Sequence, residues 1–133
     1  MVTAMLHESL RQYLAALKAG EPAQGADGSF TLIFDSQYRV TFLMLTHGDL
    51  LLEARVFQLP DEPRSRRTTL EMLLEQAGSR LESHPEWIAL APGGQLLVLQ
   101  QVLSANADHA QFRASLDDFV NALAGWRRLV GVL

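Results

Sequence analysis

Apolar residues recur on alternate positions in the stretch 30–59, which two short polar breaks divide into three runs. In the first run, Phe30, Leu32 and Phe34 stand at every second position. Period-two patterns rich in aromatic and β-branched residues are typical of strands. The breaks are too short for a parallel crossover, so neighbouring strands should pair antiparallel. The pattern predicts an antiparallel meander of three strands, at residues 30–34, 38–45 and 50–59.

Two other stretches repeat apolar residues at spacings of three and four, the pattern of an amphipathic helix. The first helix is predicted over residues 3–19. The second is predicted over residues 68–83, after a polar crossing loop at 61–67. Thr68 or Thr69 can supply the N-cap of the second helix.

The remainder of the chain predicts two more strands and a last helix. The strands are expected at residues 87–91 and 96–103, joined by a tight turn that contains Pro92 and two glycines. Asn106 is the expected N-cap of the third helix. Gly125 is a candidate for its end, which leaves the following residues as a tail or a last helical turn.

The predicted order of elements is therefore α-β-β-β-α-β-β-α. One antiparallel sheet with three helices packed on it is an α+β fold. The chain has 133 residues, and we expect a single domain over residues 1–133.

The predicted elements carry more apolar surface than a small domain readily buries. Both faces of the meander are apolar, because Ile33, Leu43 and Leu45 lie opposite the first alternating set. A sheet that is apolar on both faces must cover both or use one for binding. A chain of this size buries only part of its surface, so we expect the excess to contact a second copy of the chain, another protein, or both.

Composition and charge exclude several classes of function. The net charge is −4, and nucleic-acid binding calls for clustered basic residues. The tightest basic cluster, Arg64, Arg66 and Arg67, falls in the predicted loop and is interpreted as a solvated linker rather than an anion site. The chain has no cysteine, no recognisable secretory signal and no apolar run long enough to span a membrane, all of which fit a reducing cytoplasm.

No set of residues has the spacing that catalysis or metal binding requires. The histidines share no metal-ligand spacing with one another or with a carboxylate, and we expect them to be exposed; they are His7, His47, His84 and His109. The adjacent Asp117 and Asp118 point in different directions on a helix and indicate a solvated face. We therefore predict no enzyme activity, no catalytic residue, no cofactor and no metal.

The order of these segments resembles the class I type III secretion chaperones, the Tir-chaperone-like family. The resemblance covers residues 3 to about 126 and depends on pattern and topology rather than on a sharp motif. The segments that carry it are the helix that ends at Gly20, the hairpin of residues 38–42 and 50–54, the helix at 70–81, the strands at 87–90 and 96–103, and the acidic-apolar segment 115–120.

This resemblance implies a cytoplasmic bacterial homodimer without catalytic activity. Such a protein would bind no nucleic acid and would not insert into a membrane. The second helix and the fourth strand would make much of the dimer contact. The implied dimer-interface residues are Leu70, Leu74, Ala77, Gly78, Leu81, Trp87 and Ile88. A glycine at position 78 would let two helices approach closely.

The resemblance also implies a partner, the N-terminal region of a secreted effector that is bound in extended form and kept secretion-competent. Apolar side chains of the effector would dock on the first helix and on the sheet. The implied effector-binding residues are Leu6, Leu10, Leu14, Phe30, Leu32, Val40, Phe42, Leu97, Leu99 and Leu103. Which of them belong to the core and which to a binding patch stays open at this point.

Two alternatives to this reading remain. The first is a small α+β adaptor or regulatory domain that uses the same apolar surface to bind a folded partner. The second is an enzyme or small-ligand domain with a closed pocket, which the absence of a triad, a metal set and a phosphate loop disfavours.

Overall fold

The computed structural model describes residues 29–131, so the helix predicted at 3–19 lies outside the described part of the chain. Within that part the chain forms one five-stranded sheet, two α-helices and one short 3-10 helix. The elements are β1 (Phe30–Phe34), β2 (Tyr38–Met44), the 3-10 helix η1 (Thr46–Gly48), β3 (Leu50–Gln58), α2 (Pro63–Arg80), β4 (Trp87–Leu90), β5 (Leu96–Leu103) and α3 (His109–Gly131).

The five strands lie in the order β1-β2-β3-β5-β4, and every neighbouring pair is antiparallel. The predicted antiparallel meander is therefore confirmed. In the β1–β2 hairpin, Asp35 and Ser36 both have positive φ, 52° and 60°, and the Gln37 amide donates to the Phe34 carbonyl at 3.0 Å. Two positive φ values in succession match the twist of the flanking strands, which is why so short a break suffices.

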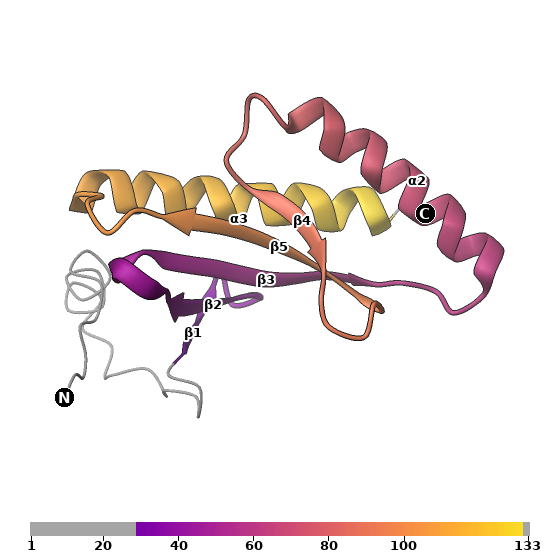
Figure 1. Ribbon diagram of the computed structural model, residues 1–133, viewed down its shortest axis with the longest axis horizontal. Coiled ribbons are helices and arrows are strands. Elements are labelled where there is room, and N and C mark those ends of the chain that lie inside the picture. Colours follow the sequence, from indigo (N-terminus) through magenta and orange to yellow (C-terminus); the bar gives the residue numbers. More distant parts are fainter. Residues whose placement is uncertain (1–28, 132–133) are drawn as a thin grey trace.

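Helix α3 lies along one face of the sheet, and the core fills the space between them (Figure 1). The apolar residues of the predicted alternation point to this face, which we call the covered face. Seven α3 side chains are buried against it: Phe112, Leu116, Phe119, Val120, Leu123, Trp126 and Val130. Figure 1 shows both described helices on the same side of the sheet, so no helix among residues 29–131 covers the opposite, open face.

Helix α2 begins earlier than the sequence indicated. It starts at Pro63, and Glu62 caps it by accepting a hydrogen bond from the Arg64 amide at 2.5 Å. Proline suits the first helical position, because the amide that it lacks has no partner there in any helix. The predicted loop at 61–67 and the predicted cap at Thr68 or Thr69 are therefore wrong.

The early start also changes the interpretation of the arginine cluster, which belongs to the first turns of α2 rather than to a linker. Arg66 donates to the Gly94 carbonyl in the β4–β5 turn, and Arg67 pairs with Glu71 at 3.1 Å. The Arg66 contact ties the beginning of α2 to the sheet.

Helix α3 differs from the prediction at both ends. It begins at His109, and Asp108 rather than Asn106 precedes its first turn. The Asp108 carboxylate accepts from the Gln111 amide at 2.8 Å, while the Gln111 side chain accepts from the Asp108 amide at 2.9 Å, which is the reciprocal pattern of a capping box. Gly125 does not end the helix, because Trp126 and Val130 are buried in the core and hold the next turns in place.

Candidate protein-interaction surfaces

Four of the six large apolar side chains that are exposed among residues 29–131 lie on α2, at its C-cap or on the edge strand β4. Leu74 of α2 and Leu81 at its C-cap are 67% and 76% exposed, and Trp87 and Leu90 of β4 are 40% and 44% exposed. Isolated exposed apolar residues are ordinary, but several on two neighbouring segments of the chain mark an interaction site. We call Leu74, Leu81 and Leu90 the α2–β4 surface; Trp87 stands opposite Gln100 and faces the other side of the sheet.

The residues that the family resemblance assigned to a dimer interface fall into two groups. Leu74 and Leu81 belong to the α2–β4 surface, and Gly78 is also exposed, with nothing within 4 Å of an added Cβ. Trp87 is exposed as well, but on the open face of the sheet. The other three are half-buried and pack against the core; they are Leu70, Ala77 and Ile88. The sequence analysis did not identify Leu90, although Leu90 stands two residues after Ile88 and alternate residues of a strand point to the same face.

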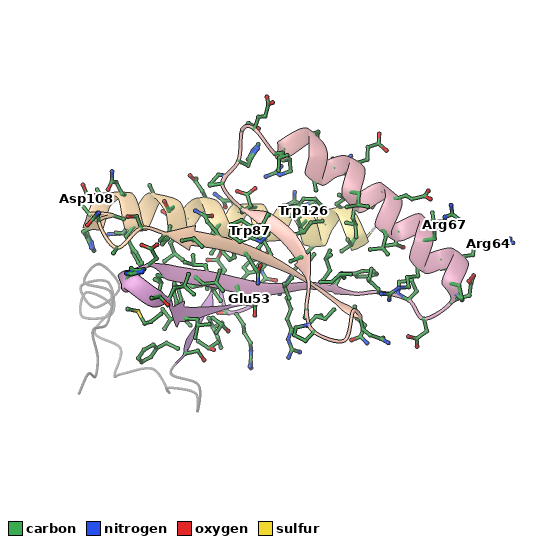
Figure 2. All side chains as sticks on the ribbon, viewed as in Figure 1. Glu53, Arg64, Arg67, Trp87, Asp108 and Trp126 are labelled. Atoms are coloured by element: carbon green, nitrogen blue, oxygen red, sulfur yellow. The ribbon has the colours of Figure 1, made fainter. Side chains whose placement is uncertain are left out.

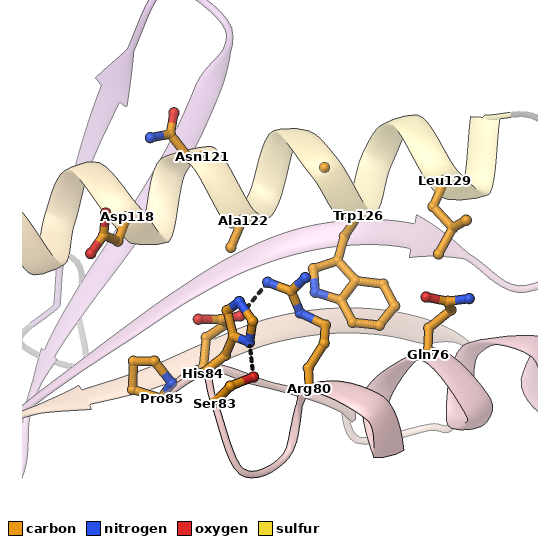
Figure 3. Close-up of a pocket in the computed structure, with 12 residues that line it drawn as sticks. Gln76, Arg80, Ser83, His84, Pro85, Asp118, Asn121, Ala122, Trp126 and Leu129 are labelled. Carbon is orange, nitrogen blue, oxygen red and sulfur yellow. Dashed lines mark hydrogen bonds and ion pairs between the residues drawn. The ribbon is translucent and has the colours of Figure 1, made fainter.

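A small set of contacts anchors the rest of α2. Leu73 is buried in the core, and Arg80 near the end of the helix pairs with the buried Glu86 at 2.8 Å. The Arg80 guanidinium also lies 5.9 Å from the centre of the Trp126 ring, within the range of a cation–π contact. Figure 3 shows Arg80 between the segment that follows α2 and the indole of α3.

Arg80, Glu86 and Trp126 also line an open pocket of about 590 Å³ between α2 and α3. Trp126, Ala122 and Leu129 supply its apolar wall, and Arg80 and His84 are among its polar residues. The pocket holds no triad of nucleophile, base and orienting group. The only hydrogen bond of the His84 side chain to the described residues is with Ser83, at 2.7 Å, and both residues are exposed.

The residues assigned to effector binding are also divided by the structure. Leu6, Leu10 and Leu14 lie outside the described residues. Phe30 and Leu32 are half-buried on the edge strand β1 and pack against the core. The other five are fully buried, on the covered face beneath α3: Val40, Phe42, Leu97, Leu99 and Leu103. Burial leaves these five no surface for direct contact with an effector in this arrangement.

The open face of the sheet has a polar row that crosses all five strands. Thr31, Thr41, Glu53, Gln100 and Trp87 stand directly opposite one another on successive strands. The Trp87 indole donates to the Gln100 side-chain oxygen at 2.9 Å, and the Gln100 amide donates to Glu53 at 2.7 Å. These hydrogen bonds run from Trp87 through Gln100 to Glu53, and Figure 2 labels the first and the last of these residues. Sequence reasoning missed the row because it is visible only once the register is known.

The histidines and the acidic pair show no sign of chemistry in the described residues. His47 and His84 are exposed, His109 is half-buried, and His7 lies outside the described range. Asp117 and Asp118 are exposed on α3, as a solvated face requires. Residues 29–131 contain no group of three or more potential ligands that could hold a metal ion, and no helix in that range is both long and apolar enough to cross a bilayer.

The sequence pattern of the Tir chaperone protein (CesT) family matches residues 8–127. Because this match covers most of the chain, the chain belongs to that family. The resemblance drawn from the order of elements is thereby confirmed. No curated protein matches the chain in sequence.

Solved structures of type III secretion chaperones share the fold. A chain of the HopA1–SchA chaperone–effector complex superposes with a TM-score of 0.71 at 16% identity, over 96% of this chain and 99% of that one. A chain of the ExsC–ExsE complex gives 0.70 at 21% identity, over 92% and 91%. A chain of the heterodimeric ExoU–SpcU complex from the type III secretion system of Pseudomonas aeruginosa gives 0.67 at 18% identity, over 89% and 94%. At these identities the likeness establishes the α+β fold.

Proposed function

We propose that this chain is a non-catalytic type III secretion chaperone of the bacterial cytoplasm. As a homodimer it binds the N-terminal chaperone-binding region of a secreted effector in extended form and keeps it stable and secretion-competent. Membership of the Tir chaperone family is the observation that carries this proposal. The solved complexes named above pair chains of the same fold with effectors or other protein partners, which supports a protein client.

The α2–β4 surface is the proposed dimer interface. Leu74 and Leu81 contribute nothing to the core of one chain, so their exposure is explained if a second copy covers them. The open space around Gly78 would let the partner helix come close to the α2 backbone. Half-buried Leu70, Ala77 and Ile88 would complete the interface from below.

The proposed effector site includes the edge strand β1. Within the described residues β1 pairs only with β2, so its other side can receive a further strand. An extended client would add main-chain hydrogen bonds there, while its apolar side chains pack beside Phe30 and Leu32. Leu6, Leu10 and Leu14 would extend this patch, and the buried residues of the covered face would support it from beneath. No step requires a cofactor.

Co-expression with the N-terminal regions of candidate effectors tests this function. We expect one such region to co-purify with the chaperone, to be protease-sensitive once released, and to bind a dimer seen by sedimentation velocity. A chain that sediments as a monomer at micromolar concentration and retains no effector segment would contradict the proposal. Recovery of a compact, protease-resistant partner would instead favour an adaptor for folded proteins.

A further inference from the structure

Two exposed arginines, Arg39 of β2 and Arg55 of β3, lie on the open face of the sheet. Ile33 pairs with Arg39 across β1 and β2, and both are exposed. The pairing of β2 with β3 ends at Thr41 and Glu53, and Arg39 and Arg55 each lie two residues beyond that pair on the same face. We call Ile33, Arg39 and Arg55 the basic row.

One side chain of α3 contacts both strands near these two arginines. Arg127 of α3 donates two hydrogen bonds to the Arg55 carbonyl, at 3.1 and 2.7 Å, and its guanidinium lies 5.4 Å from the centre of the Tyr38 ring. One side chain of α3 therefore reaches both the start of β2 and the middle of β3.

The two positive charges have no counter-ion among the described residues. Neither guanidinium takes part in an ion pair within residues 29–131. Glu53 is the only acidic residue in the five described strands, and its carboxylate accepts the Gln100 amide on the side towards β5, away from β2. Like charges on the same face of neighbouring strands repel each other. In a chain of net charge −4, this leaves a local site that favours an external carboxylate.

We propose that the basic row is a recognition site for an acidic-aliphatic stretch of the client, bound in extended form on the open face. The inference rests on the proposed chaperone function and adds the chemistry of the segment that is recognised. One glutamate or aspartate of the client lies between Arg39 and Arg55, since guanidinium groups match carboxylate geometry. A neighbouring aliphatic side chain covers Ile33, which is 56% exposed.

Peptide binding by the full-length protein tests this proposal. The probe is a short fluorescein-labelled peptide in which glutamate and leucine alternate, compared with versions that carry glutamine or lysine in place of glutamate. Fluorescence anisotropy at low salt should show the glutamate peptide binding several-fold more tightly than the glutamine peptide. That preference should shrink at about 0.15 M salt, because the contacts are exposed.

Substitutions in the row identify the site. Arg39→Gln and Arg55→Gln should each weaken the glutamate peptide by roughly two- to five-fold, the range measured for exposed ion pairs, and leave the glutamine peptide unchanged. Arg39→Glu combined with Arg55→Glu should transfer the preference to the lysine peptide. Arg113→Gln is the matched control, since Arg113 is an exposed arginine on α3, a different element. Thermal unfolding of each variant verifies that it folds.

The outcomes separate this proposal from the proposed function. Equal binding of the glutamate and glutamine peptides, or equal losses in Arg113→Gln and Arg39→Gln, would overturn the basic row while the chaperone function stands. Failure to bind any peptide and any effector segment would overturn both. A photo-crosslinking residue at position 33 that reacts with a second copy, or with the chain's own N-terminal residues, would show that another occupant covers the row.

Discussion

Helices α2 and α3 lie on the same side of the sheet, but the rest of the chain covers them very differently. Seven side chains of α3 are buried, whereas α2 buries only Thr69 and Leu73. Both helices carry leucines at helical spacing, and that spacing by itself does not say which leucines are buried. The difference teaches that α3 belongs to the core and that the outer apolar residues of α2 are left for contact with another molecule.

The largest expected effect comes from α3. Phe119→Ala removes a fully buried side chain from the centre of the core, and it should lower the free energy of unfolding by about 3–5 kcal/mol. Urea denaturation measures this loss. The matched change in α2, Leu74→Ala, should alter the stability of an isolated chain by less than about 0.5 kcal/mol, because Leu74 is exposed. Similar losses in the two variants would end the distinction between the helices.

Dimer formation, unlike the stability of the single chain, should depend on the exposed residues of α2 rather than on α3. Leu74→Asp places a charge on the α2–β4 surface, and we expect the dimer dissociation constant to rise by at least about ten-fold, since a charge buried at an interface without a partner is strongly unfavourable. Sedimentation equilibrium over a concentration series measures it. Arg113→Asp is an exposed change on α3 that should leave the constant unaltered. An unchanged constant for Leu74→Asp would place the dimer interface elsewhere.

The anchor between the two helices should give an intermediate effect. Arg80→Met removes the ion pair with Glu86 and leaves that buried carboxylate without its partner, at a cost of about 1–2 kcal/mol. The double variant Arg80→Met/Glu86→Gln should recover part of the loss, because no unpaired charge is buried. Hydrogen exchange should show faster opening at the C-terminal turn of α2 than in α3. Equal exchange in wild type and variant would mean that other contacts fix α2.

The smallest expected effect is that of Gly78→Ala, and its sign tells whether position 78 lies in the dimer interface. Gly78→Ala adds a methyl group that meets nothing within 4 Å, so an isolated chain should gain up to about 1 kcal/mol from the better helix propensity of alanine. If a second α2 helix approaches at this position, the same methyl should weaken the dimer. Melting temperatures measured at protein concentrations well below and well above the dimer dissociation constant separate the effect on the single chain from the effect on the dimer. A gain at both concentrations would show that position 78 lies away from the interface.

Sequence reasoning identified the strands well, because period-two alternation directly encodes which face of a sheet is buried. Val40 and Phe42 are fully buried, as that alternation requires, and the same fact removes them from direct contact with a client. Helix ends were less predictable. The start of α2 at Pro63 depends on the Glu62 cap, and the continuation of α3 past Gly125 depends on the burial of Trp126.

The residues of the candidate surfaces were also predicted only in part, but the reason differs from that for the helix ends. Leu74 and Leu81 were identified through the family resemblance, and burial then separated them from Leu70. The polar row and the basic row each combine residues from strands that are far apart in the sequence. Their members come to one face of the sheet through the pairing of β1 with β2, of β2 with β3 and of β3 with β5, which no local pattern specifies.

Arg127 holds α3 to β3 through the carbonyl oxygen of residue 55, not through its side chain. Any amino acid at that position except one that disturbs the backbone offers the same acceptor. Residue 55 can therefore change identity without loosening the helix from the sheet, so its side chain is free to be selected by whatever molecule meets it from outside.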